Sequence, residues 1–485
     1  MTGARFTSRW GLILATLGMA IGTGNIWRFP RVVAQNGGGA FVVAWAVFLF
    51  AWSIPLLIAE YGLGRASRRG PVGAFTRLVG RGWSWAGGFI VLCTLLIGCY
   101  YAVVTGWCLR YLLSCITGAL DGIEPATAEA AFLEQASGVS AAVFQVFAVA
   151  FGVAIVARGV EGGIEKACKV LVPALFVLLV IAAIRALTLP GAGAGLAFLF
   201  HVDTSLFADH RLWLEALSQS AWSTGAGWGL MLAYAVYAAG TPREAAQNCV
   251  ITGIGNNCAS LLAACAVIPA VFALAPAAGQ DPAALVAQSG PASTGLTFLW
   301  MPVLLRGMPG GAFFTPLFFI ALVAAALSSL ISMVELGVRT LEDLGLARRR
   351  SVAWIGAFLI LGGLPSALSL EVFANQDWVW GLGLMVSGAL CASAVIRMGA
   401  ARFRATCLGE ERAPGRWARV WTLLVTVGVP LQFVALMIWW FTQAAGWGNA
   451  WSLANPFSIA HCLLQWGAVA ALLMLLNRKI GASAI

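Results

Sequence analysis

Long apolar stretches recur from one end of the 485-residue chain to the other, and 60% of its residues are hydrophobic. Each stretch has about 20 residues or more, the length that a helix needs to cross ~30 Å of hydrocarbon. A soluble core cannot bury so much apolar surface. The pattern therefore predicts an all-α polytopic membrane protein with twelve transmembrane helices, at roughly 10–32, 39–63, 86–116, 139–157, 167–189, 213–240, 248–275, 312–340, 351–370, 378–398, 418–444 and 454–477.

The first span is interrupted by polar and flexible residues. Residues 17–30 read LGMAIGTGNIWRFP, with Gly18, Gly22 and Gly24 close together and Pro30 after them. A glycine costs about 1 kcal/mol relative to alanine inside a helix. Backbone groups freed by a break cost several kcal/mol each in lipid unless something satisfies them. We therefore expect this break to line a cavity or hold a ligand.

The sixth span has the same peculiarity. Residues 219–229 read QSAWSTGAGWG, with Gly225, Gly227 and Gly229 in the middle of the span. Paired interruptions at corresponding positions of two repeats are typical of transporters with a binding site at the midplane. The alternative is that these glycines only allow close helix packing. The polar residues inside both breaks favour the transporter interpretation.

The basic residues follow the membrane topology. The chain has 29 Lys and Arg against 19 Asp and Glu, and a net charge of +10. With an inner N-terminus, most of the basic residues fall in inner loops, which predicts that both termini are cytoplasmic. The excess is thus a topology signal and not a nucleic-acid interface. No CxxC or Cys/His ligand cluster occurs, so metal binding by such a cluster is not expected. No Asn-x-Ser/Thr acceptor occurs either, which favours a bacterial inner membrane. We also expect the first apolar stretch to stay in place, because no signal-peptide cleavage site follows it.

Several segments resemble one family specifically. The chain is similar to the neurotransmitter:sodium symporters, above all to their bacterial sodium-coupled amino-acid transporters, in GMAIGTGNIWRFP (18–30), QNGGGAF (35–41), IPLLIAEYGLGR (54–65), CYYAVVTGW (99–107), EALSQSAWSTGAGWG (215–229), AALSSLISMVE (325–335) and LED (341–343). The resemblance implies one transporter domain over 1–485. Its expected parts are two inverted repeats at 10–189 and 213–398, with discontinuous first and sixth helices, and two further spans at 418–477.

The resemblance also implies two sodium sites. One would use the Ala20 carbonyl, Asn25, Ser223 and Asn256, with the adjacent Asn257 as an alternative to Asn256. The other would use oxygens of Gly18, Ile21, Ala325, Ser328 and Ser329. Hydroxyls, amides and free carbonyls are the oxygen ligands that hard cations prefer. Without the family context, Ser328 and Ser329 would be interpreted as ordinary helix-packing residues.

By the same resemblance, the substrate carboxylate would meet the N–H groups of Thr23 and Gly24 and the Tyr101 hydroxyl. Gly22 stands where monoamine carriers of the family have an aspartate, which favours an amino acid or a similar zwitterion. The remaining substrate-site residues would be Ala20, Ile97, Trp222, Ser223, Gly225, Trp228, Ser329 and Met333. Trp222 replaces a common phenylalanine and Gly225 a common serine. These changes have opposite effects on pocket size.

Gates and an anion site follow from the resemblance as well. Arg28 would pair with Asp377, or alternatively with Glu371, at the outer side. Arg5 or Arg9 would act with Asp343 and Tyr237 at the inner side. The seventh span has no acid, which opens the question of chloride. The candidate residues for chloride are Trp45, Gln219, Ser223, Asn256 and Ser260, with Trp45 in place of the family's tyrosine.

The predicted function is sodium-coupled import of an amino acid by alternating access, by a monomer or homodimer in the lipid bilayer. Three alternatives stay open from sequence: a carrier of a betaine-like zwitterion, a proton-coupled carrier, and a non-transporting sensor on the same scaffold. An enzyme is not expected, because no set of nucleophile, base and metal ligands is present.

Overall fold

The twelve predicted spans correspond to helices in the computed structural model, which describes residues 4–242, 244–289, 294–410 and 415–483. These ranges contain helices, turns and loops but no strand. Within the described ranges, ten helical stretches are long and apolar enough to cross a membrane, and the bent pair α1 (Arg9–Ala20) and α2 (Thr23–Gln35) makes an eleventh. The sixth predicted span forms α11 (His210–Ser223) and α12 (Leu230–Ala235), joined by a non-helical linker at 224–229.

The remaining spans are longer helices, several with a π-helical turn. They are α3 (Gly39–Phe48), η1 (Leu49–Ser53) and α4 (Ile54–Ser67); α6 (Ser84–Ile116); α8 (Val139–Ala157); η4 (Val160–Glu165) and α9 (Lys166–Leu187); α13 (Glu244–Leu274); α16 (Gly311–Asp343); α17 (Arg348–Leu368); α18 (Leu370–Met398); α20 (Arg416–Leu423), η10 (Leu424–Gly428) and α21 (Val429–Gly446); and α22 (Ile459–Ser483). Short helices in the connections are α5 (Pro71–Ala74), α7 (Pro125–Ala136), α10 (Ala192–Phe200), α14 (Pro282–Ala287), α15 (Met301–Gly307) and α19 (Ala400–Phe403).

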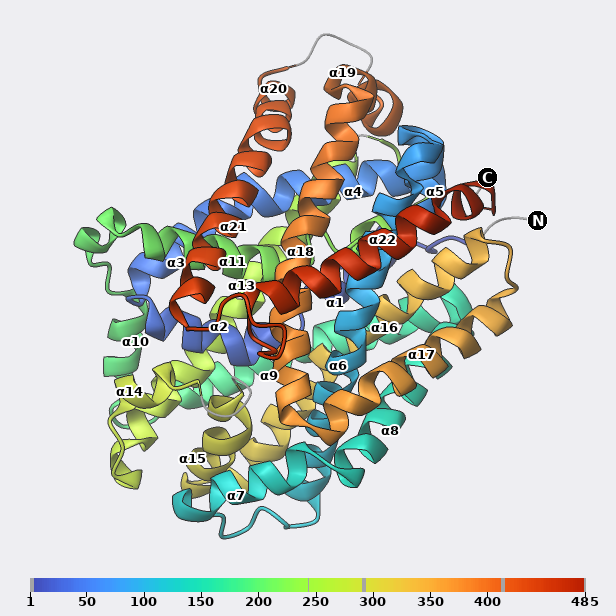
Figure 1. Cartoon of the computed structure of the whole chain (residues 1–485). Coiled ribbons are helices and arrows are strands. Elements are labelled where there is room, and N and C mark those ends of the chain that lie inside the picture. The colour runs from blue at the N-terminus through green and yellow to red at the C-terminus, as the bar shows by residue number, and fades with distance from the viewer. Residues whose placement is uncertain (1–3, 243, 290–293, 411–414, 484–485) are drawn as a thin grey trace.

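Burial separates the centre of the bundle from its periphery. The apolar segments of α6 and α16 are 83% buried, whereas those of α20–α21 and α22 are only 22% buried. In Figure 1 the late helices α20, α21 and α22, in red, lie on the near side of the bundle. The peripheral helices expose large apolar side chains such as Leu431, Ile438 and Leu475, which suits contact with lipid tails. The site must therefore be sought between the early helices, α16 and α18.

The first break lies between α1 and α2, whose axes differ by 51°. Gly22 is extended there, and its N–H donates to Asn25 Oδ1 over 2.9 Å. This bond caps α2 with a side chain that belongs to the helix itself. The break predicted from the glycines is confirmed, and it leaves the N-terminus of α2 free inside the bundle.

The second break is held by a carboxylate from a neighbouring span. Gly225, Gly227 and Gly229 have φ values of +68°, +91° and +76°, a region that side chains other than glycine rarely adopt. The fully buried Glu60 of α4 accepts the N–H groups of Gly227 over 2.5 Å and of Leu232 over 3.3 Å. Sequence reasoning missed Glu60, although an acid inside an apolar span is itself a functional signal.

Candidate functional site

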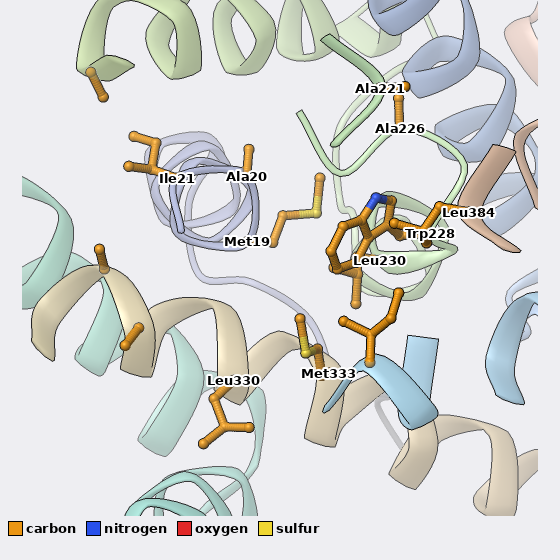
Figure 2. Packing of buried hydrophobic residues seen from close by; sticks show 14 of the residues in the cluster. Met19, Ala20, Ile21, Ala221, Ala226, Trp228, Leu230, Leu330, Met333 and Leu384 are labelled. Carbon is orange, nitrogen blue, oxygen red and sulfur yellow. The ribbon is translucent and has the colours of Figure 1, made fainter. Parts of the chain in front are cut away.

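A cavity of about 540 Å³ lies against both breaks. Its wall combines residues of α1, α2, α6, the 224–229 linker, α16 and α18. Figure 2 shows Met19, Trp228 and Met333, from three of these elements, arranged around one space. The cavity brings together every residue of the predicted substrate site: Ala20, Gly22, Thr23, Gly24, Ile97, Tyr101, Trp222, Ser223, Gly225, Trp228, Ser329 and Met333.

One side of the cavity suits an anion. The N–H of Thr23, in the first turn of α2, donates to the Tyr101 hydroxyl over 3.1 Å. A methyl group added at Gly24 would meet nothing within 4 Å, so open space lies beside this residue. The N-terminus of a helix carries free N–H groups and partial positive charge. Thr23, Gly24 and Tyr101 thus form a place where a carboxylate can be bound.

The first predicted cation site is a group of converging oxygens beside this place. Asn256 Oδ1 lies 3.0 Å from the Ala20 carbonyl oxygen and 3.0 Å from the Ser223 carbonyl oxygen. Oxygens this close repel one another unless a cation lies between them or the amide is turned so that its nitrogen faces them. Asn25 Nδ2 contacts Asn256 Oδ1 at 2.8 Å, whereas Asn257 contacts the other amide atom of Asn256 at 3.2 Å. In either orientation the Asn256 amide, and not that of Asn257, faces the Ala20 and Ser223 carbonyls. With its oxygen turned toward them, the three oxygens make a neutral ligand set that fits a hard cation.

The second predicted cation site lies between α1 and α16. Ser329 Oγ is 3.2 Å from the Gly18 carbonyl oxygen and 3.4 Å from the Ile21 carbonyl oxygen. Ser328 Oγ donates to the Ala325 carbonyl over 3.0 Å. These oxygens are neutral and buried, as at the first site. Elsewhere in the described ranges, no three His, Cys, Asp or Glu side chains come together to hold a metal.

The predicted chloride residues form a partial set. Asn25 Nδ2 donates to Ser260 Oγ over 2.8 Å and to Ser223 Oγ over 3.2 Å. Asn256 Nδ2 also donates to Ser223 Oγ, over 2.9 Å. Ser260 therefore has its own hydroxyl proton available. Trp45 Nε1 and Gln219 Oε1 are buried without a hydrogen-bond partner. An unpaired buried indole N–H is costly in apolar surroundings, and an anion would satisfy it.

At one end of the cavity, Arg28 and Asp377 both line the wall. The Arg28 guanidinium lies 4.7 Å from the Trp222 ring centre, and the ion pairs of the described residues do not include one between Arg28 and Asp377. Two further charged residues, Arg31 and Glu215, line the same end and were not predicted. Glu371, the alternative partner for Arg28, is exposed at the start of α18. This end is open.

At the opposite end, the structure does not bring Arg5 or Arg9 to Asp343. Asp343 pairs instead with Arg339 over 2.5 Å and Arg69 over 3.5 Å. Arg9 reaches Glu244 at 3.9 Å. Arg339 lies one turn before Asp343 on α16, and Arg69 lies between α4 and α5, so neither partner of Asp343 comes from the N-terminal segment.

Tyr237 is linked to Asp343 through Arg339, whose guanidinium lies 5.8 Å from the Tyr237 ring centre. Its hydroxyl donates to Glu335 over 2.5 Å, and Arg348 pairs with Glu335 over 2.7 Å. The N-terminal segment joins this network because the Phe6 N–H donates to the Tyr237 carbonyl over 3.2 Å. Glu335 and Arg348 were missed from sequence. The available signal was Glu335 itself, a fully buried acid in an apolar span.

Comparison with known proteins agrees with this architecture. A model of the sodium:neurotransmitter symporter family matches residues 4–128 and 127–368. An uncharacterized sodium-dependent transporter of Bacillus subtilis is 31% identical, over 90% of this chain and 97% of its own length. A second one, from Methanocaldococcus jannaschii, is 32% identical over 73% of each chain.

Among solved structures, the chain is similar to MhsT in complex with L-phenylalanine. The TM-score is 0.78 and the identity 31%, over 90% of this chain and 99% of MhsT. The family and the fold are those of multi-pass membrane transporters, not of enzymes. The chain belongs to the sodium:neurotransmitter symporter family.

Proposed function

We propose that the protein is a symporter that uses an inward sodium gradient to import an amino acid across the bacterial inner membrane. The observation that carries the proposal is the joining of three features at one cavity: the free N-terminus of α2, the Tyr101 hydroxyl, and the oxygen group around Asn256. An anion site beside a cation site is what a zwitterion and a co-transported cation require.

Substrate recognition follows from these groups. The carboxylate binds the N–H groups of Thr23 and Gly24, with the Tyr101 hydroxyl as a further donor. Gly22 adds no acidic side chain, so the substrate brings its own negative charge. The side chain of the substrate extends toward Met19, Trp228 and Met333, which present an apolar surface (Figure 2). Support for an amino acid comes from the similarity to MhsT, whose structure contains L-phenylalanine.

The backbone that leads into α2 takes part in both predicted sodium sites and in the substrate site, which couples their binding. Ala20 and Ile21, whose carbonyls face the two oxygen groups, directly precede the N-terminus of α2. A sodium ion among the oxygens of Asn256, Ala20 and Ser223 fixes the position of that N-terminus. Substrate and sodium then stabilise the same conformation, so the binding of one raises the affinity of the protein for the other.

One end of the cavity is open and the other is closed, as an alternating-access carrier requires. The cavity is open at the Arg28 end, and the opposite end is closed by the ion pairs of Asp343 and Glu335. With both termini cytoplasmic, the open end faces outward. Import then requires that the Arg28 end closes over the substrate before the opposite network opens.

Chloride is part of the proposal as a charge-balancing ion. The unpaired Trp45 indole N–H and the Ser260 hydroxyl support it. No carboxylate takes that place in α13, whose only acidic residue is Glu244 at its start. We expect uptake to fall when external chloride is replaced by gluconate.

The test is thermal stability of the purified protein with each of the twenty amino acids and betaine, in sodium and in potassium. Ligands that bind the folded state raise its apparent stability by mass action. Stabilisation by a small set of amino acids only in sodium, followed by sodium-driven uptake into proteoliposomes, is the expected result. Stabilisation by betaine alone or equally in potassium would overturn the amino-acid or the sodium assignment. Binding without uptake would indicate a sensor.

A further inference from the structure

The indole of Trp222 lies in a notch that exists only because residue 381 is glycine. A Cβ atom built on Gly381 would lie in contact with Trp222 Cζ2, 2.6 Å from Cη2 and 3.0 Å from Cε2. Distances under 3.0 Å are not tolerated by rigid rings, and an indole cannot bend away from the clash. The observed position of Trp222 therefore requires a glycine on α18.

The notch is next to the charged residues of the open end. Gly381 follows Asp377 by four residues on α18, so both lie on one face of the helix. The Arg28 guanidinium lies 4.7 Å from the Trp222 ring centre. The outer atoms of the same ring fill the notch beside Gly381. The Trp228 ring is 6.1 Å away, at an interplanar angle of 76°. Trp222 is thus held between Arg28, Trp228 and Gly381, at the edge of the cavity.

We propose that Gly381 is a specificity-determining position, because it keeps Trp222 out of the cavity and so leaves room for a bulky substrate side chain. This inference rests on the proposed transport function. A side chain at residue 381 displaces the indole, and the free volume beside it is the cavity that Trp222 lines. The cavity then loses the volume of the six-membered part of an indole, and large substrates lose more affinity than small ones.

Arg28 is linked to the same position. While the indole lies in the notch, it holds the guanidinium by a cation–π contact, and no ion pair with Asp377 forms.

The experiment is a double-mutant cycle with Gly381→Ala and Trp222→Phe, measured as sodium-driven uptake of the largest and the smallest amino acids that the wild type accepts. Phenylalanine lacks the Cζ2 and Cη2 atoms that fill the notch. Gly381→Ala is expected to raise KM for the large substrate about tenfold or more, and that for the small one about twofold or less. In the Trp222→Phe background, the same change is expected to have little effect on either KM.

Gly383→Ala is the matched control on the same helix. Its Cβ would meet Cys93 Sγ at 3.0 Å and not Trp222. A KM change equal for both substrates, equal in the Trp222→Phe background, or equal in Gly383→Ala would overturn the inference. If Gly381→Ala alone does not fold, the double variant Gly381→Ala with Trp222→Phe should still fold. A double variant that does not fold would also overturn the inference. Absence of uptake by the wild type would instead refute the proposed function.

Discussion

Glu60 offers the most direct test of how the broken sixth span is held. The 224–229 linker has three glycines in left-handed conformations, and the buried Glu60 carboxylate accepts N–H groups on both sides of the last one, from Gly227 and Leu232. A hydrogen bond to a charged group contributes about 1.5–3 kcal/mol. Glu60→Gln keeps one acceptor oxygen and replaces the other by an NH2 donor, so one of the two hydrogen bonds is lost. The free energy of unfolding should fall by about 2 kcal/mol. Glu60→Ala loses both bonds and should lose about 4 kcal/mol.

The assay compares thermal unfolding of the purified variants in detergent, with and without sodium. The Ala variant should unfold at a clearly lower temperature than the Gln variant, which in turn should unfold below wild type. Both should also weaken sodium-dependent stabilisation by substrate, because the linker forms a wall of the cavity. Glu371→Gln, at an exposed acid of another span, serves as the control. Equal unfolding temperatures for Glu60→Ala and Glu371→Gln would refute the reasoning.

Three further predictions follow from the site. Tyr101→Phe removes the hydroxyl beside Thr23 and should raise KM for the substrate about tenfold to a hundredfold, as expected for one bond to a carboxylate; unchanged uptake kinetics would contradict it. Ser329→Ala removes an oxygen shared with Gly18 and Ile21 and should raise the sodium concentration for half-maximal uptake several-fold, with less effect on substrate KM at saturating sodium; the reverse pattern would contradict it. Ser260→Glu places a fixed negative charge beside Asn25 and should make uptake independent of chloride; persistent chloride dependence would contradict it.

The helices and both breaks could be predicted from local sequence, because their causes are local. An apolar run of about 20 residues crosses a bilayer as a helix wherever it lies in the chain. Gly18, Gly22 and Gly24, or the three glycines of the 224–229 linker, weaken a helix through their own backbone freedom. The division into repeats at 10–189 and 213–398 stays a prediction of the same kind.

The substrate-site residues were named from the resemblance, and the structure places all of them around one cavity. Motif similarity works here because the backbone around the breaks supplies many of the contacts. The contact between Arg5 or Arg9 and Asp343 was expected on the same basis, and the structure gives Asp343 other partners. Several arginines lie near enough to pair with Asp343, so the spacing of a motif along the chain does not predict which of them forms the ion pair.

What the sequence by itself determined is the membrane topology class, the two interruptions and the chemical types of the site residues. The tertiary structure decided which groups share a contact: Glu60 with the linker, Glu335 with Tyr237 and Arg348, and Trp222 with Gly381. The partners in these contacts come from different helices or lie too far apart along the chain for any local pattern to join them. Only packing fixes their distances, because an indole fits a notch or a carboxylate reaches an N–H within a few tenths of an ångström.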